Sequence, residues 1–203
     1  MPKRPVQQPQ AMTKQAKYTN SDIIQSFTAF RTLMDTKNDK FERIVKMSRD
    51  VTITSKRIIF NLHRISPDLD NKVAVLAESK EKLHNLIPIF ERIGSELEGE
   101  DVYLYFRAYT NGVQEFIEAI SFYHVIVSEA VIRPDQLSEY FGPSMCPLIN
   151  SDYFGGIADL TGEMMRMCIS FIGRGDVETG NRLRELLYQV SGAVRQSGVT
   201  GAI

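Results

Sequence analysis

The chain of 203 residues has few cysteines, no excess of either charge and no long apolar run. Its two cysteines, Cys146 and Cys168, lack zinc-type spacing and favour a reducing compartment. With 24 basic and 25 acidic residues the net charge is −1, so any nucleic-acid-binding surface has to be a local patch. No apolar run could span a bilayer and no signal peptide is evident, so we expect a soluble protein without a membrane partner.

The chain also lacks a Pro-, Gly- or Ser-rich linker after its N-terminal segment. Its length is compatible with one or two domains, and the missing linker favours one. Residues 1–18 are rich in Pro, Gln and Lys and offer almost nothing to bury. We therefore predict a disordered tail over residues 1–18, a single helical domain over residues 19–196 and a flexible end over residues 197–203.

Apolar residues recur at helical intervals, and no stretch shows a convincing strand alternation. The absence of Pro and Gly between residues 21 and 65 predicts one long helix there. A second helix is expected over residues 69–97, with a kink at Pro88. The remaining helices are predicted over residues 100–128, 135–140, 151–172 and 177–195. The predicted fold is all-α, an antiparallel α-helical bundle.

Two of these helices carry unusual acidic pairs. Glu115 and Glu118 lie in the segment NGVQEFIEAISFYH, which is apolar on nearly every side. A helix with this pattern is normally buried, so we expect both carboxylates in a recess or at an interface. Asp159 and Glu163 lie in the segment ADLTGEMMRM, on a stripe that begins at Asp152.

Four carboxylates in one recess could not all ionise without a cation, and a hard divalent ion such as Mg²⁺ or Mn²⁺ would balance them. Such an ion can orient a phosphodiester and activate water, which predicts a nuclease. The alternative is a non-catalytic helical adaptor, because acids at this spacing usually lie on a solvated face or join ion pairs. Arg107 could pair with Glu115 or Glu118, and Arg166 with Glu163.

A basic stripe follows the second half of the first predicted helix. Its members are Lys46, Arg49, Arg57 and Arg64. Such a stripe is ordinarily a solvated helix face, and the less common alternative is contact with an RNA backbone.

Three stretches resemble the translin family, in particular its translin-associated factor X (TRAX) branch. They are DKFERIVKMSRDVTITSKRIIFNLHRI (39–65), GEDVYLYFRAYTNGVQEFIEAISFYHVI (99–126) and DYFGGIADLTGEMMRMCIS (152–170). The resemblance spans about residues 27–177 and implies a bundle of roughly seven helices that joins translin in a closed hetero-octameric shell. After about Thr179 the chain departs from the family pattern, so the C-terminal helix is expected to be absent or shortened.

The resemblance further implies a Mg²⁺-dependent endoribonuclease that cuts single-stranded RNA during small-RNA passenger-strand removal and tRNA fragment processing, in cytoplasm and nucleus. Carried over by position, the catalytic carboxylates are Glu115, Glu118 and Asp159. The metal ligands implied are Glu118, Asp159 and Glu163, with Mn²⁺ as an alternative ion. The candidate contacts to the RNA backbone are then Lys46, Arg49, Arg57 and Arg64.

Overall fold

The computed structural model describes residues 20–66, 68–138, 140–142 and 145–196. The predicted tail over residues 1–18 and the predicted flexible end over residues 197–203 lie outside these ranges. All regular structure in the described ranges is helical, without a strand, which confirms the all-α prediction. In the same ranges, no helix combines the length and the apolar character needed to cross a membrane.

The described residues form seven helices. They are α1 (Asn20–Leu62), α2 (Leu69–His84), α3 (Ile87–Leu97), α4 (Val102–Ser128), α5 (Pro134–Leu137), α6 (Asn150–Gly173) and α7 (Val177–Gln196). Their ends agree with the predicted ranges to within one helical turn, except between α2 and α3.

The prediction of a single kinked helix over residues 69–97 is wrong. Two helices occupy this range, and Asn85 and Leu86 separate them. Pro88 lies in the first turn of α3, where its missing N–H removes no helical hydrogen bond. The proline therefore begins a new helix and does not kink an existing one.

Contacts divide the chain into two units, residues 1–39 and 40–203, and the boundary falls inside α1. In the described part of the first unit, every residue from position 20 to 39 is exposed. Four apolar side chains there follow the spacing of one helix face: Ile23, Phe27, Phe30 and Met34. All the predicted site residues belong to the second unit, which is described by itself below.

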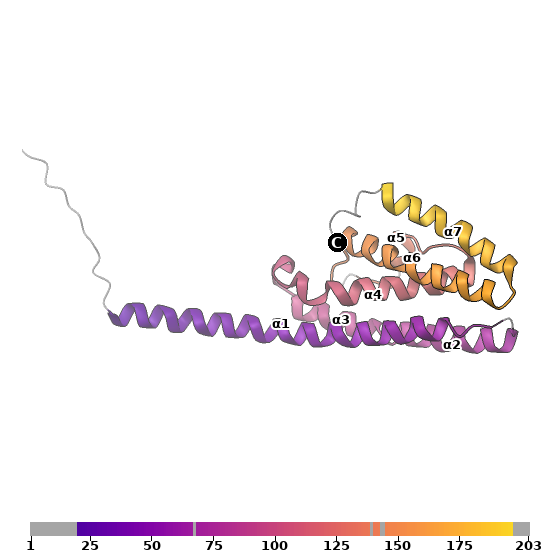
Figure 1. Cartoon of the computed structure of the whole chain (residues 1–203). Helices are drawn as coiled ribbons and strands as arrows, with labels where there is room; N and C mark the ends of the chain where they lie inside the picture. Colours follow the sequence, from indigo (N-terminus) through magenta and orange to yellow (C-terminus); the bar gives the residue numbers. More distant parts are fainter. Residues whose placement is uncertain (1–19, 67, 139, 143–144, 197–203) are drawn as a thin grey trace, which may run out of the picture. The chain divides into compact units, whose positions relative to one another are not determined.

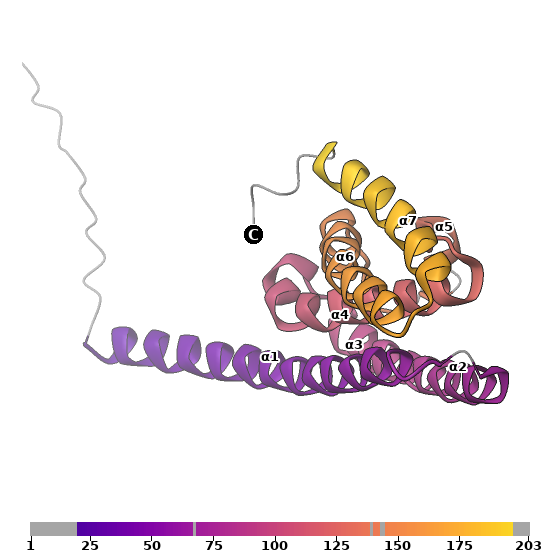
Figure 2. The same ribbon diagram turned by 45° about the vertical axis from the view of Figure 1, so that its right-hand side comes forward.

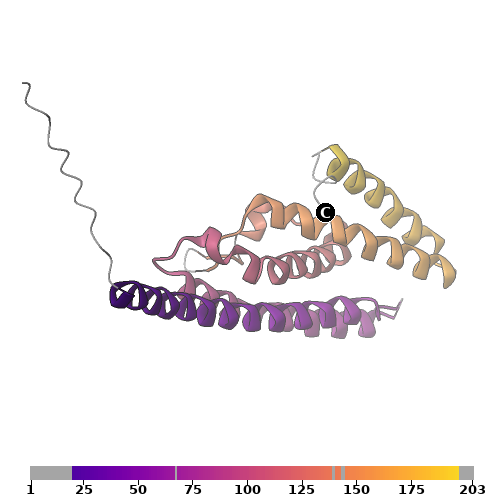
Figure 3. The ribbon, with the colours of Figure 1, turned by 60° about the vertical axis from the view of Figure 1, so that its left-hand side comes forward.

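Within the second unit, α4 is the central helix. The final part of α1 runs beside α2 and α3, and α4 lies over them (Figure 1). α6 packs on α4, and α7 covers the opposite side of α6 (Figures 2 and 3). Because α4 has neighbours on several sides, its apolar residues are buried almost all round, among them Tyr109, Phe116 and Phe122.

Glycines let α4 approach α1 and α6 closely. The N–H of Gly112 donates to the Ser48 hydroxyl over 3.2 Å, and a Cβ at Gly112 would lie 2.6 Å from that oxygen. A Cβ at Gly156 of α6 would lie 2.7 Å from the main-chain oxygen of Gln114 and from Cβ of Ile117. Both approaches are therefore available only to residues without a side chain. The two glycines keep α1 and α6 close enough to α4 for the acidic side chains of α4 to interact with residues of both helices.

We expect Gly156→Ala to lower the free energy of unfolding by about 1–3 kcal/mol, because the added methyl forces α6 away from α4. Gly162→Ala in the same helix is the matched control. A Cβ there meets nothing within 4 Å, so the substitution should be neutral or should stabilise by up to about 1 kcal/mol through helix propensity. Urea denaturation measures both, and equal effects would contradict the proposed close packing.

Candidate functional site

The structure brings the four predicted carboxylates together where α4 faces α1 and α6. Glu115 and Glu118 come from α4, and Asp159 and Glu163 come from α6. We call these four side chains the acidic cluster. Glu118 is its central member, because the charges of the other three all act on its carboxyl group.

Glu118 is buried, with only 8% of its surface exposed. Burial is the main cause that raises the pKa of its carboxyl, to about 7. The negative charges of Glu115, Asp159 and Glu163 act in the same direction, and the ammonium of Lys56 acts against them. Both protonation states of Glu118 are therefore populated near neutral pH, which is a property of groups that exchange protons in active sites.

Lys56 of α1 supplies the positive charge nearest to Glu115. Its Nζ lies 2.8 Å from Oε1 of Glu115. The hydrogen bond to Glu115 is the largest cause that raises the pKa of Lys56, and the charges of Glu118 and Asp159 add to it. Among the described residues, Glu115 therefore pairs with Lys56 and not with Arg107, which is exposed.

Glu163 has two cationic or protonatable partners. His63, directly after the end of α1, places Nε2 2.5 Å from Oε2 of Glu163, and the guanidinium of Arg166 lies 3.4 Å from Oε1. The pairing of Arg166 with Glu163 confirms the prediction from the sequence. The His63 ring also packs on Phe122, with the ring centroids 4.9 Å apart, so its position is set by α4 as well as by Glu163.

Asp159 lies at the rim of the acidic cluster. The residue as a whole is exposed, yet the pKa of its carboxyl is raised, first by partial burial and then by the charge of Glu115. Lys56 opposes this shift. Asp159 is thus the member of the cluster that a ligand from solvent reaches most directly.

Asp152 does not belong to the acidic cluster, although it begins the same stripe in the sequence. It is fully buried two turns earlier in α6, where Thr110 and Gln114 of α4 donate to its Oδ1, the latter over 3.1 Å. Burial raises the pKa of Asp152 as well. This carboxyl joins the N-terminal end of α6 to α4, and its role is structural.

Within the described ranges, no three His, Cys, Asp or Glu side chains are arranged to hold a metal ion. The ion pairs account for this, because Glu115 turns towards Lys56 and Glu163 towards His63 and Arg166. The donor chemistry itself fits a hard divalent cation, since carboxylate oxygens are the ligands that Mg²⁺ and Mn²⁺ prefer. The metal site therefore stays a prediction.

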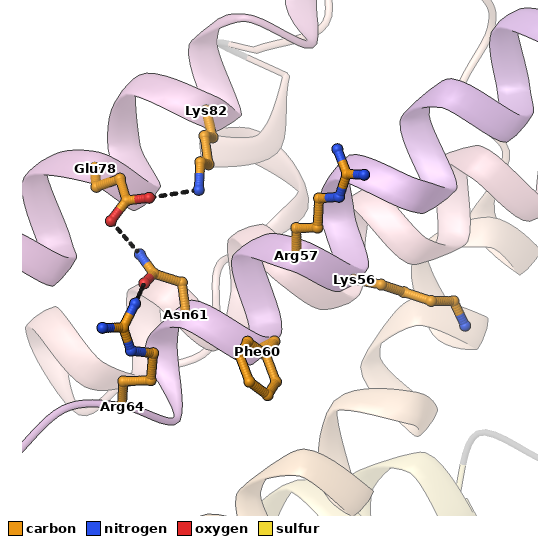
Figure 4. Close-up of a pocket in the computed structure, with 7 residues that line it drawn as sticks. All are labelled: Lys56, Arg57, Phe60, Asn61, Arg64, Glu78 and Lys82. Atoms are coloured by element: carbon orange, nitrogen blue, oxygen red, sulfur yellow. Dashed lines mark hydrogen bonds and ion pairs between the residues drawn. The ribbon is translucent and has the colours of Figure 1, made fainter.

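The four residues of the predicted basic stripe are all exposed, three of them on α1 and Arg64 in the turn directly after it. Arg57 and Arg64 line a groove of about 350 Å³ between α1 and α2 (Figure 4). Lys46 lines a second groove, which it shares with Arg92 of α3. Arg49 lies on the same exposed side of α1. The stripe therefore faces solvent along its length, as a surface that contacts a ligand requires.

Two functional candidates, Lys56 and His63, were not predicted from the sequence. They are seven residues apart, Lys56 on α1 and His63 directly after its end, and both side chains are turned towards the acidic cluster. This spacing was the only signal available, and it becomes informative only once α1 is known to pack beside α4 and α6.

The model of the translin family matches residues 39–198. The chain belongs to the translin family. The match begins at the boundary between the two units and reaches past the end of α7, so the departure expected after Thr179 is less complete than predicted.

Several members of the family are similar to the chain over most of its length. It is 36% identical over 208 residues to translin-associated protein X of Pongo abelii, and the alignment covers 90% of this chain and 71% of that protein. The corresponding protein of Rattus norvegicus gives the same values. The homologue from Schizosaccharomyces pombe is 29% identical, over 72% of this chain and 62% of its own length.

A solved structure supports the translin fold. The crystal structure of apo-NeC3PO superposes with a TM-score of 0.58 and 18% identity, and covers 84% of this chain and 92% of its own. At this level of identity the likeness establishes the fold alone.

The raised pKa of Glu118 predicts a pH-dependent stability. Since the folded-state pKa is about 7 and the ordinary value is 4.5, the folded chain binds more protons between these values, and stability falls as the pH rises through this window. Glu118→Gln removes the buried charge and should stabilise the chain by about 2–4 kcal/mol at pH 8, with almost no effect at pH 4.5.

Denaturation in EDTA at both pH values measures this difference. Glu185→Gln, on the exposed face of α7, is the control and should show the same small change at both. A stabilisation by Glu118→Gln that does not depend on pH would contradict the burial of a charge at this position.

Proposed function

We propose that the chain is the catalytic subunit of a Mg²⁺-dependent endoribonuclease that cuts single-stranded RNA together with translin. One observation carries the proposal: three carboxylates from two helices surround a fourth, the buried Glu118, whose pKa is raised to about 7. Repulsion among them makes the site selective for a multivalent cation. Membership of the translin family and the similarity to translin-associated protein X support the translin partner, since that name records the association.

The proposed ligands are Glu118 and Asp159, with Glu163 beside them. When bound there, Mg²⁺ stabilises negative charge on a phosphodiester and lowers the pKa of water. Glu118 would hold the ion as a carboxylate, the form that its burial disfavours and that a nearby positive charge would favour. Asp159, at the solvent-facing rim, contacts the ligand that enters from outside.

Glu115 is proposed to orient the attacking water. In the structure its Oε1 is engaged by Lys56, and Oε2 of Glu163 is engaged by His63. Lys56 and His63 neutralise part of the negative charge of the acidic cluster in the folded chain. Both must release their carboxylates for the metal site to form. Lys56 then becomes available to the RNA backbone, together with Lys46, Arg49, Arg57 and Arg64 of the basic stripe.

A second candidate function is a non-catalytic helical adaptor. The ion pairs of Glu115 with Lys56 and of Glu163 with His63 and Arg166 favour it, because they give the buried acids a structural role. Under this hypothesis the chain binds translin through its helices, and replacing Mg²⁺ by EDTA leaves its RNA-related function unchanged.

Cleavage of a labelled single-stranded RNA by the chain with purified translin tests the leading proposal. Glu118→Gln and Asp159→Asn should each lower the rate by at least about 100-fold, because they remove a charge from the site that activates water. Glu185→Gln on α7 is the matched control. Full activity in either site variant, or in EDTA, would favour the adaptor.

Lys56→Gln should bind Mn²⁺ about ten-fold more tightly than the wild type, because the variant no longer presents a competing cation to Glu115. Calorimetry or electron paramagnetic resonance measures this affinity without any nuclease assay. Lys80→Gln, an exposed lysine of α2, controls for the change in net charge. Equal Mn²⁺ affinities in all three proteins would show that Lys56 does not compete with the metal.

A further inference from the structure

The groove between α1 and α2 combines positive charge with an exposed aromatic ring. One side is formed by Lys56, Arg57, Phe60 and Asn61 of α1 together with Arg64 of the turn that follows, and the α2 side by Glu78 and Lys82. Phe60 is 72% exposed, so its ring presents a large apolar surface to solvent. Figure 4 shows the ring projecting from α1 with Arg64 on one side and Arg57 and Lys56 on the other.

The charges in the groove are only partly neutralised. Glu78 pairs with Lys82 over 2.5 Å, and Lys56 pairs with Glu115 outside the groove. Arg57 and Arg64 form no salt bridge with an acidic side chain among the described residues. Arg64 donates to Asn61 and its charge acts on the Glu78 carboxyl, so the Arg57 guanidinium and the remaining donors of Arg64 are left for a ligand. These groups present forked donors that match the geometry of phosphate oxygens.

Buried hydrogen bonds set the position of Arg64. Asn61 is buried, and its amide nitrogen donates to Ser79 over 3.1 Å and to Glu78 over 3.2 Å. Its amide oxygen accepts from Arg64 over 3.3 Å. The groove is therefore organised by contacts between α1 and α2, and is more than a chance gathering of surface lysines and arginines.

The arrangement along α1 is regular. Arg57 and Phe60 occupy positions i and i+3 on one face of α1, and Arg64 follows in the turn directly after the helix ends at Leu62. A cation, an aromatic ring and a second cation in this order match the way in which proteins bind a single strand, with bases stacked on aromatic rings and the backbone held by basic groups. An apolar partner that covered Phe60 would instead bury two unpaired guanidinium groups at a large cost.

We propose that this groove is a nucleotide subsite in which a base of single-stranded RNA stacks on Phe60 while Arg57 and Arg64 hold the adjoining phosphates. The substrate class rests on the proposed function; the subsite adds a specificity that the acidic cluster does not supply. A base in a duplex is already stacked on its neighbours, so the Phe60 ring favours an unpaired strand. Lys56 lines this groove and also pairs with Glu115, which places the subsite next to the acidic cluster.

The test compares two labelled ligands bound by the full chain in EDTA, where cleavage does not occur: an oligouridine, and an abasic oligomer with the same number of phosphates. Phe60→Ala should weaken oligouridine binding about ten-fold and leave abasic binding unchanged. Phe60→Tyr, which keeps an aromatic ring, should restore the affinity. Tyr188→Ala removes another exposed aromatic side chain, on α7, and is the matched control.

Arg57→Gln should weaken both ligands and lower the dependence of the logarithm of affinity on the logarithm of salt by about one. An equal loss on both ligands in Phe60→Ala, or no loss on either, would overturn the stacking role. A wild-type chain that binds neither ligand would overturn the subsite altogether.

A different result decides the nuclease proposal, so the two proposals can fail independently. If Phe60→Ala weakens binding of oligouridine alone in EDTA, but the wild-type chain cleaves no RNA with Mg²⁺ and translin, the subsite stands and the nuclease proposal falls. If the wild-type chain cleaves RNA with Mg²⁺ and translin while Phe60→Ala binds oligouridine normally, the nuclease proposal stands and the subsite falls.

Discussion

Repulsion among like charges is the constraint around which the second unit is arranged. Glu118 is buried beside three other acids, and its raised pKa is the direct sign of that cost. The charge is tolerated because Lys56 of α1 and His63, directly after the end of α1, lie at hydrogen-bonding distance from Glu115 and Glu163. Without close packing of α1 and α6 on α4 these partners could not reach the acids. The glycines of that interface are therefore as much a part of the site as the carboxylates.

α1 contributes residues to two different surfaces. One face carries the partners of the acidic cluster, and the neighbouring exposed face carries Arg57, Phe60 and Arg64 in the groove with α2. Lys56 lies between the two faces and takes part in both. A side chain shared in this way couples ligand binding in the groove to the charge state of the cluster, because its ammonium group cannot neutralise Glu115 and a phosphate equally well at the same time.

The two candidate functions make opposite demands on these ion pairs. An adaptor needs the pairs of Glu115 and Glu163 to persist, since they make the buried acids structural. A metal-dependent nuclease needs them to open, since a divalent ion and Lys56 compete for the same carboxylate. Glu118 favours the second case, because no cationic side chain forms a salt bridge with it among the described residues, and the charge of Lys56 offsets its burial only in part.

The sequence by itself determined the helices, the family and the identity of the four acids. Helical periodicity is local, so the bounds came out to within a turn, and the error at Pro88 arose because a proline can either kink a helix or begin one. Only the tertiary structure decided which side chains meet. It separated the buried Asp152 from Asp159, joined both acidic pairs into one cluster, and revealed Lys56, His63 and the Phe60 groove. These depend on how α1, α4 and α6 pack, and spacing within one helix carries no information about the neighbour that faces it.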